Sequence, residues 1–213
     1  MPNWWTTRRK KLVSGGLAVL ALLLAFLSRT LPAALAALAM CLSALGDAVL
    51  GGYPACFARV RDKLVKGGVI FLGAHVLYIL ALIPASGRDA SALLPHCIRP
   101  LILFSGLTAL LTALFAFRGR GAQPPAFSAA AFAYLLAVGV HAAAAFTAAG
   151  QGGGWLALNA AGALLFYLSD AILLARSFGA FHGRDMTDPI WFTYAPAQLC
   201  ILLGFFLSGP AAG

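Results

Sequence analysis

Two aspartates lie inside long apolar stretches of this sequence, where a charged side chain is uncommon. Asp170 belongs to the stretch Gly162–Leu174, and Asp47 lies near the end of the run 31–50. An aspartate near the middle of a membrane-spanning helix costs about 2.5–3.5 kcal/mol on insertion scales, so it generally faces the protein interior and serves a function. Paired carboxyl groups can donate and accept protons in a reaction. We therefore predict an integral membrane enzyme whose chemistry depends on Asp170 and Asp47.

Other polar side chains fall at a similar depth in the apolar runs. Counting about 1.5 Å per residue from the predicted cytoplasmic end of each run places the two aspartates about 5–8 Å deep. The same rise places His75 and Tyr78 roughly 10–15 Å deep, and Tyr194 and Gln198 about 6–12 Å deep. Within each of these two pairs the residues are three or four positions apart, so they share a helix face. The pattern predicts one pocket that opens toward the cytoplasm.

A structural role is the alternative for each of these polar residues, because Ser, Tyr, Gln and His also join helices inside membrane bundles. This alternative applies most strongly to single residues such as Ser43, Ser169 and Gln198. It also applies to Asp47 if the end of its run lies among the lipid headgroups. His141 lies about 22 Å from the inner end of its run by the same rise, so we expect it to miss the pocket and to have a structural role.

Seven apolar runs must position these residues, and each is close to the roughly 17–25 residues that cross a bilayer. They cover about residues 12–28, 31–50, 68–85, 98–117, 126–149, 154–175 and 190–208. Residues 8–11 and the first run resemble a signal peptide, but the next run follows almost at once, so we expect a retained first span. Because the connections are short, consecutive spans should be antiparallel neighbours. We predict an all-α transmembrane bundle that forms a single domain over residues 1–213.

Basic residues are distributed unevenly between the two sides of these runs. Twelve fall on one side: Arg8, Arg9, Lys10, Lys11, Arg59, Arg61, Lys63, Lys66, Arg118, Arg120, Arg176 and Arg184. Three fall on the other: Arg29, Arg88 and Arg99. Loops on the cytoplasmic side carry the excess of Lys and Arg. We therefore expect the N-terminus inside, in a multi-pass protein of a bacterial cytoplasmic membrane.

The composition excludes a soluble domain. Of the 213 residues, 62% are hydrophobic and only 10% are charged, where a soluble domain has about 25% charged residues. The net charge of +9 could indicate nucleic acid, but the basic residues lie between apolar runs, so we predict no nucleic-acid partner. The four cysteines show no disulfide or metal-ligand spacing. A retinal-binding receptor is excluded because it needs a lysine inside a span, and all four lysines lie at span ends.

Four motifs occur in the order of a known family of membrane enzymes. They are Leu42–Leu50 (LSALGDAVL), Phe71–Ile79 (FLGAHVLYI), Gly162–Asp170 (GALLFYLSD) and Tyr194–Gln198 (YAPAQ). Together they resemble the lysoplasmalogenase family of integral membrane alkenyl ether hydrolases, over most of the chain from about residue 40 onward. That family generally has eight spans, and this chain begins where the second would lie. It also has Ala195 and Pro196 where the family usually has a second aromatic or aliphatic residue.

The resemblance implies that a lysophospholipid with a vinyl ether bond is cleaved to a fatty aldehyde and a glycerophospho-headgroup. Its slow step, proton transfer to the β-carbon, needs a carboxylic acid that is protonated near neutral pH, and a partner carboxylate can stabilise the cation and activate water. We predict Asp170 as the donor and Asp47 as the ionised partner, with the reverse assignment open, and His75 as a residue that orients a carboxyl group or the water. The predicted substrate-binding residues are Tyr78, Ser169, Tyr194 and Gln198. Neither a metal nor a cofactor is needed.

Two alternatives remain at this point. The basic loop with Arg59, Arg61, Lys63 and Lys66 could hold the substrate phosphate, or it could reflect membrane topology alone. A proton-coupled carrier of a small amphiphile or lipid is the rival function, because intramembrane Asp and His also form proton relays. The sequence shows a single inward-facing cluster and no internal repeat that would supply alternating access. It indicates contact with membrane lipid and does not indicate an oligomeric state.

Overall fold

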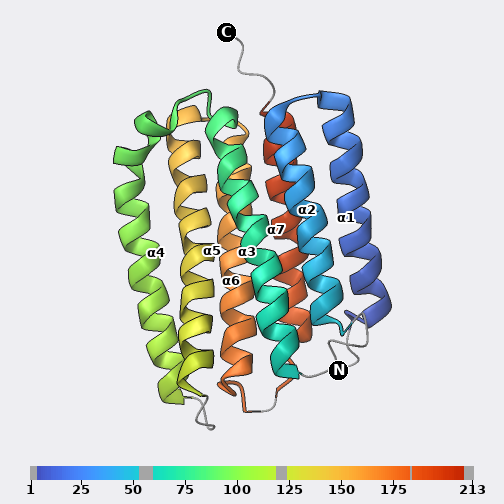
Figure 1. Ribbon diagram of the computed structural model, residues 1–213, viewed down its shortest axis with the longest axis vertical. Coiled ribbons are helices and arrows are strands. Elements are labelled where there is room, and N and C mark those ends of the chain that lie inside the picture. The colour runs from blue at the N-terminus through green and yellow to red at the C-terminus, as the bar shows by residue number, and fades with distance from the viewer. Residues whose placement is uncertain (1–3, 53–59, 119–123, 183, 209–213) are drawn as a thin grey trace.

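The computed structural model describes residues 4–52, 60–118, 124–182 and 184–208, and within these ranges it contains seven helices and no strand (Figure 1). The helices are α1 (Thr7–Ser28), α2 (Leu31–Leu50), α3 (Val60–Ala85), α4 (Ala90–Arg118), α5 (Pro125–Gly152), α6 (Leu156–Ser177) and α7 (Thr187–Leu207). All seven are long and apolar enough to cross a membrane. The predicted all-α bundle of seven spans is confirmed, and the protein is an integral multi-pass membrane protein.

Several helices begin well before the apolar run that predicted them. The α1 helix begins at Thr7 instead of residue 12, α3 at Val60 instead of 68, and α4 at Ala90 instead of 98. In α1 the hydroxyl of Thr6 caps the first turn by accepting a hydrogen bond from the Arg9 amide at 3.4 Å. Backbone hydrogen bonding continues to such a cap, whereas hydropathy marks only the part of a helix that matches the hydrocarbon core. Depths counted from the apolar runs are therefore too small for α3.

Six of the helices form a closed ring. The α1 helix packs on α2, α2 on α3, α3 on α5, α5 on α6, α6 on α7, and α7 on α1. The α7 helix also contacts α2 and α3, so it reaches across the ring. The α4 helix lies outside, mainly against α5, with only Phe104 and Thr108 buried among its described residues (Figure 1). Consecutive spans are neighbours as predicted except for α3 and α4, because α5 packs on α3 in place of α4.

Two glycines allow the close approaches that position the site. A Cβ atom at Gly46 in α2 would lie 2.7 Å from the ring of Phe71, so this glycine makes the space that the ring fills. A Cβ atom at Gly162 in α6 would lie 2.7 Å from the Ala197 carbonyl oxygen of α7. Small residues let membrane helices pack closely in this way. They fix α2 against α3, and α6 against α7.

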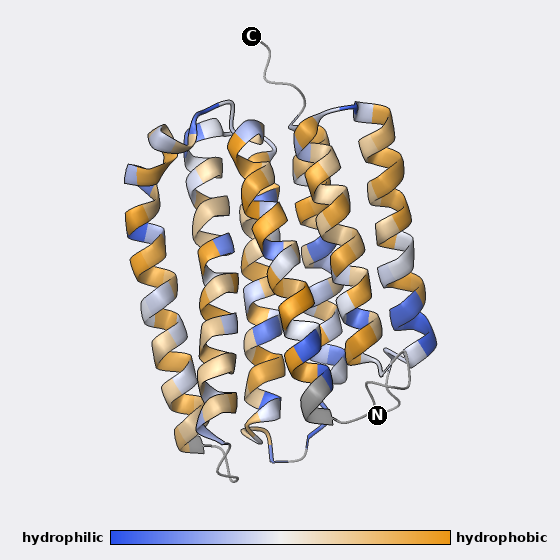
Figure 2. Ribbon diagram, in the orientation of Figure 1, coloured by the Kyte–Doolittle hydropathy of each residue, from blue (hydrophilic) through white to orange (hydrophobic). Residues whose placement is uncertain are grey.

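Hydrogen bonds inside the bundle join the same helices. The Asn159 carboxamide of α6, oriented to satisfy both of its groups, donates to the Ile201 carbonyl at 3.1 Å and accepts from the Phe205 amide at 3.2 Å. The α6 and α7 helices are therefore tied at one end by Asn159 and are in close contact at Gly162. Figure 2 shows hydrophilic residues on several helices in the half of the bundle where α1 begins. That half contains the candidate site.

Candidate active site

A cavity of about 720 Å³ lies among α1, α2, α3, α6 and α7. Its wall includes residues at the helix ends on one side of the bundle: Thr7, Gly51, Lys63, Ser177 and Thr187. The cavity therefore reaches the predicted cytoplasmic end of the protein. Its volume lies within the range of small-molecule sites, about 300–1,000 Å³. Both Asp47 and Asp170 belong to its wall, so helices whose aspartates are far apart in sequence bring them to one space.

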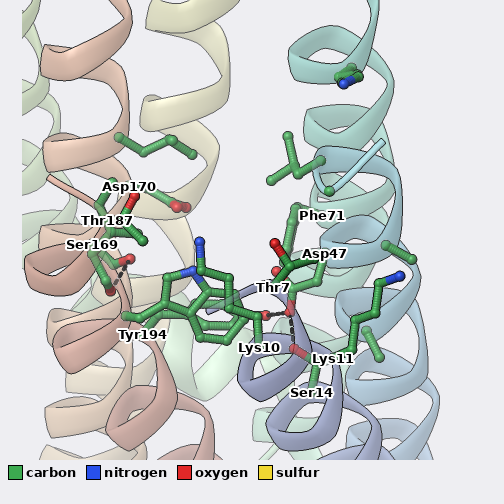
Figure 3. Close-up of a pocket in the computed structure, with 18 of the residues that line it drawn as sticks. Thr7, Lys10, Lys11, Ser14, Asp47, Phe71, Ser169, Asp170, Thr187 and Tyr194 are labelled. Carbon is green, nitrogen blue, oxygen red and sulfur yellow. Dashed lines mark hydrogen bonds between the residues drawn. The ribbon is translucent and has the colours of Figure 1, made fainter. Parts of the chain in front are cut away.

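Asp47 lies near the end of α2 and is half-buried. Its Oδ2 accepts a hydrogen bond from the Ser14 hydroxyl of α1 at 2.5 Å and another from the Tyr194 hydroxyl of α7 at 2.9 Å. Figure 3 shows both bonds, with Tyr194 reaching across the cavity toward Asp47 and with Asp170 on the facing side. Lys10, one turn before Ser14 in α1, lines the same cavity. Two donors and a neighbouring cation suit an ionised carboxylate.

A chain of hydrogen bonds continues from Tyr194 into the bundle. The Gln198 amide nitrogen donates to the Tyr194 hydroxyl at 3.0 Å, and the Gln198 carbonyl accepts from the Tyr78 hydroxyl at 2.8 Å. Tyr78 and Gln198 are fully buried and do not line the cavity. Of these three predicted substrate-binding residues, only Tyr194 lines the cavity. Gln198 instead bonds to the Tyr194 hydroxyl, and Tyr78 bonds to Gln198.

Asp170 is the more buried of the two aspartates, with 5% of its surface exposed. Its Oδ2 accepts a hydrogen bond from the Tyr134 hydroxyl of α5 at 2.7 Å. The neighbouring Ser169, predicted to bind substrate, lines the cavity, but its hydroxyl donates to the Ile190 carbonyl of α7 at 3.2 Å. Each aspartate thus accepts a hydrogen bond from one tyrosine hydroxyl, Asp47 from Tyr194 of α7 and Asp170 from Tyr134 of α5.

Aromatic side chains hold these groups in place. The Phe71 ring lines the cavity and packs edge-on against Phe166 and Tyr194, with centroid distances of 6.0 and 6.1 Å. Trp191 packs edge-on against Tyr194 at 5.2 Å, and Trp5 covers Trp191 at the same distance. Such pairs restrict ring motion as well as burying area. The Tyr194 hydroxyl is consequently fixed in its direction toward Asp47.

His75 forms its polar contact with a second histidine and not with either aspartate. Its Nδ1 is 3.0 Å from the Nδ1 of His141, both rings are fully buried, and neither lines the cavity. His141 also stacks on Tyr78 with a centroid distance of 5.3 Å. The predicted contact of His75 with a carboxyl group does not occur in this geometry. Because α3 begins at Val60, His75 is fifteen residues from the start of its helix, about 22 Å deep and level with His141.

The cations that line the cavity come from three helices. They are Lys10 and Lys11 of α1, Lys63 of α3 and Arg176 of α6. The basic loop was open to two interpretations, phosphate binding or membrane topology alone. Of its four basic residues, Lys63 lines the cavity and Lys66 does not, while Arg59 and the side chain of Arg61 lie outside the described residues. Several lysine and arginine side chains around one cavity are suited to binding a phosphate group.

Three of the residues that shape the site were not identified from the sequence. Tyr134 is eight residues inside the predicted run 126–149, about 12 Å deep, so the depth count would have included it. Ser14 and Lys10 lie at the start of the first run, where the basic residues were interpreted as a topology signal alone. Their role depends on the packing of α1 against α2 and α7.

A protein-family model described as the YhhN family matches residues 10–205 of the chain. The match includes both aspartates, the hydroxyl groups bonded to them and the four cations of the cavity. No curated protein and no solved structure matches the chain.

Proposed function

Because the chain belongs to the YhhN family, which is the lysoplasmalogenase family, we propose that it is a membrane hydrolase that cleaves the vinyl ether bond of lysoplasmalogens. The products are a fatty aldehyde and a glycerophospho-headgroup. One observation carries the proposal beyond family membership: Asp47 of α2 and Asp170 of α6 line a single cavity with cations at its outer end. This arrangement offers two proton-transfer groups within the membrane and a place for a phosphate beside them.

The reaction requires one proton donor and one proton acceptor. The donor protonates the second carbon of the alkenyl chain, the β-carbon of the vinyl ether, and the π electrons form the new C–H bond. The ether oxygen stabilises the resulting oxocarbenium ion with its lone pair. Water adds to the carbon beside that oxygen and gives its proton to the acceptor, which leaves a hemiacetal. The hemiacetal loses its hydroxyl proton to the former donor, the bond to the glycerol oxygen breaks, and the acceptor returns its proton to that oxygen.

We assign the donor role to Asp170 and the acceptor role to Asp47. Two neighbouring carboxylates repel each other, so a pair of this kind retains one proton. Asp47 accepts hydrogen bonds from two hydroxyl groups and lines the same cavity as Lys10, whereas Asp170 accepts one such bond, from Tyr134. These neighbours favour the proton on Asp170. When Asp170 donates it, the Tyr134 hydroxyl stabilises the carboxylate that forms, because a hydrogen bond to a charged acceptor is about twice as strong as a neutral one.

The cations of the cavity determine how the substrate is oriented, with its phosphate end outward and its hydrocarbon end inward. A phosphate held by Lys10, Lys11, Lys63 and Arg176 places the glycerol at the predicted cytoplasmic end. The vinyl ether then extends inward between the aspartates. Ser169 and Tyr194 are the predicted binding residues that remain in the wall of this cavity. Their hydroxyl protons are already donated to the Ile190 carbonyl and to Asp47, so their oxygen atoms can only accept a hydrogen bond from the glycerol hydroxyl.

The proposal is tested by incubating purified protein with an alkenyl lysophospholipid and measuring aldehyde release. Asp170→Asn and Asp47→Asn each retain the side-chain size and remove the acid. Loss of a general acid or base costs about 10²–10⁴ in rate, and we expect each variant to lose at least this much kcat while remaining folded. Asp89→Asn, at an exposed aspartate between α3 and α4 at the other end of the bundle, is the matched control.

Two results would contradict the proposal in different ways. Aldehyde release that continues in both Asn variants shows that the catalytic assignment is wrong. Uptake of intact lipid into vesicles that contain the wild-type protein, with no aldehyde formed, shows that the protein is a carrier and not a hydrolase.

A further inference from the structure

A second cavity, of about 360 Å³, lies between α3 and α5 with α6 behind it. Its wall consists of aliphatic, aromatic and small side chains, among them Gly68, Val69 and Leu72 of α3 and Ala130, Tyr134 and Ala137 of α5. The hydroxyl of Tyr134 is the only polar side-chain group among the described residues of this wall, and it is bonded to Asp170. The described part of this wall therefore suits a hydrocarbon and not a charged ligand.

This apolar cavity shares part of its wall with the catalytic cavity. Leu50, Leu64, Phe71 and Leu173 line both spaces. Phe71 stands between them, and its ring fills the space that Gly46 leaves in α2. On the other side of the boundary, the Tyr134 ring faces the apolar cavity while its hydroxyl bonds to Asp170 at 2.7 Å. The apolar cavity thus adjoins the aspartate assigned as the proton donor.

The chemistry of the reaction determines which part of the substrate lies near that aspartate. The carbon that accepts the proton is the second carbon of the alkenyl chain, and the rest of the chain extends from it. With the phosphate at the cations, the hydrocarbon must continue past Asp170. The apolar cavity runs along α5 from Phe127 to Ala137, ten residues or about 15 Å. Tyr134, whose hydroxyl bonds to Asp170, lies within this length, so the cavity is open to the hydrocarbon at the level of the proton donor.

The rim of the apolar cavity faces lipid. Val65, Val69 and Leu72 of α3 are 47%, 64% and 39% exposed, and all three belong to the wall. In a bilayer these side chains contact acyl chains, so the cavity is accessible from the membrane between α3 and α5. A single-chain lipid can place its hydrocarbon there without passing through water.

We propose that this apolar cavity binds the alkenyl chain of the substrate and sets the chain length that the enzyme accepts. The inference rests on the proposed function, because the occupant is the substrate of the catalytic cavity. Ala130 and Ala137 lie seven residues apart on the same face of α5, a separation of about 10 Å. They are specificity-determining positions: a large side chain at either one closes the cavity at a different depth.

The first test is aldehyde release from alkenyl lysophospholipids with chains of ten to eighteen carbons. Ala137→Phe closes the deep end, so the ratio of long-chain to short-chain kcat/KM should fall at least about tenfold, the loss typical of a hydrophobic subsite that no longer fits. Ala130→Phe fills the cavity on the other side of Tyr134, nearer to the start of α5, so it should lower this ratio less than Ala137→Phe does. Ala129→Phe is the matched control, because Ala129 is an exposed neighbour that does not line the cavity. An unchanged ratio in folded Ala137→Phe protein would overturn the proposal.

The second test uses the wild-type protein and does not depend on catalysis. A saturated alkyl lysophosphatidylcholine with a diazirine at the chain end lacks the vinyl ether and is not cleaved. After illumination we expect the label on residues of α3 and α5 that line the apolar cavity. Label confined to other lipid-facing surfaces, such as α1 or α4, would refute the proposal even if aldehyde is released from the natural substrate. Label in the cavity with no aldehyde release would support the chain-binding site and refute the hydrolase function.

Discussion

Replacing Tyr134 with phenylalanine removes one hydrogen bond from Asp170 and little else. The Tyr134 hydroxyl donates to Asp170 Oδ2 at 2.7 Å, and its ring keeps the same place in the wall of the apolar cavity. A hydrogen bond between neutral groups contributes about 0.5–1.5 kcal/mol, and one to a charged group about 1.5–3 kcal/mol. The charge on Asp170 develops as its proton leaves, so Tyr134→Phe should raise the barrier by about 1–1.5 kcal/mol, the difference between the two values.

This difference corresponds to a fall in kcat of about tenfold, with KM nearly unchanged because the chain-binding wall is intact. The assay is steady-state aldehyde release, normalised to folded protein. Tyr167→Phe is the control: Tyr167 is buried and its hydroxyl likewise shares a hydrogen bond, with Thr108 at 2.8 Å, but Tyr167 does not line either cavity. Equal rates for the two variants would refute the reasoning. Adding Tyr134→Phe to Asp170→Asn should cause no further loss, since both changes act on one group.

Three further changes test other parts of the account. Ser14→Ala removes the 2.5 Å hydrogen bond to Asp47 and should lower kcat several-fold. Ser28→Ala, at the other end of α1, should leave kcat unchanged. Equal kcat values for the two variants would contradict the role of Ser14. Arg176→Gln removes the proposed ion pair with the substrate phosphate. KM should rise by up to about fivefold, which corresponds to about 1 kcal/mol for an exposed ion pair, and this rise should be smaller at high salt. Arg88→Gln, at the opposite end of the bundle, is the control. His141→Asn removes the ring that contacts His75 and stacks on Tyr78. The thermal midpoint of this variant should fall by about 2–4 °C for each kcal/mol of stability lost, while aldehyde release per folded molecule is retained. A lower kcat in folded protein would indicate a catalytic role for the histidine pair.

The parts of the site that the sequence predicts are those that depend on depth along a single helix. Asp47 and Asp170 were placed at similar depths by residue count, and the structure brings both into one cavity. Tyr194 was placed beside them by the same count, and its hydroxyl bonds to Asp47. An aspartate in an apolar run is a strong signal because the membrane penalises it. The rise of about 1.5 Å per residue then sets the depth of the aspartate in the membrane, independently of which helices pack beside it.

The parts that the sequence could not predict depend on helix ends and on which helices touch. His75 was placed too close to the surface because the start of α3 at Val60 lies outside the apolar run. Ser14 reaches Asp47 across 33 residues of sequence, and no periodicity in α1 indicates that contact. Tyr134 bonds to Asp170 because α5 packs beside α6. Such pairings arise from packing in three dimensions, and a single sequence carries no direct signal for them.

The central claim is that a carboxylic acid fixed inside the helical bundle delivers a proton to the second carbon of the alkenyl chain. The most direct measurement is hydrolysis in D₂O with immediate reduction of the aldehyde to the alcohol, followed by chiral analysis of the carbon that has gained deuterium. A donor held on one wall of the cavity approaches one face of the double bond, so a single enantiomer is predicted. A racemic product would show that the proton comes from freely diffusing acid, and it would contradict the account.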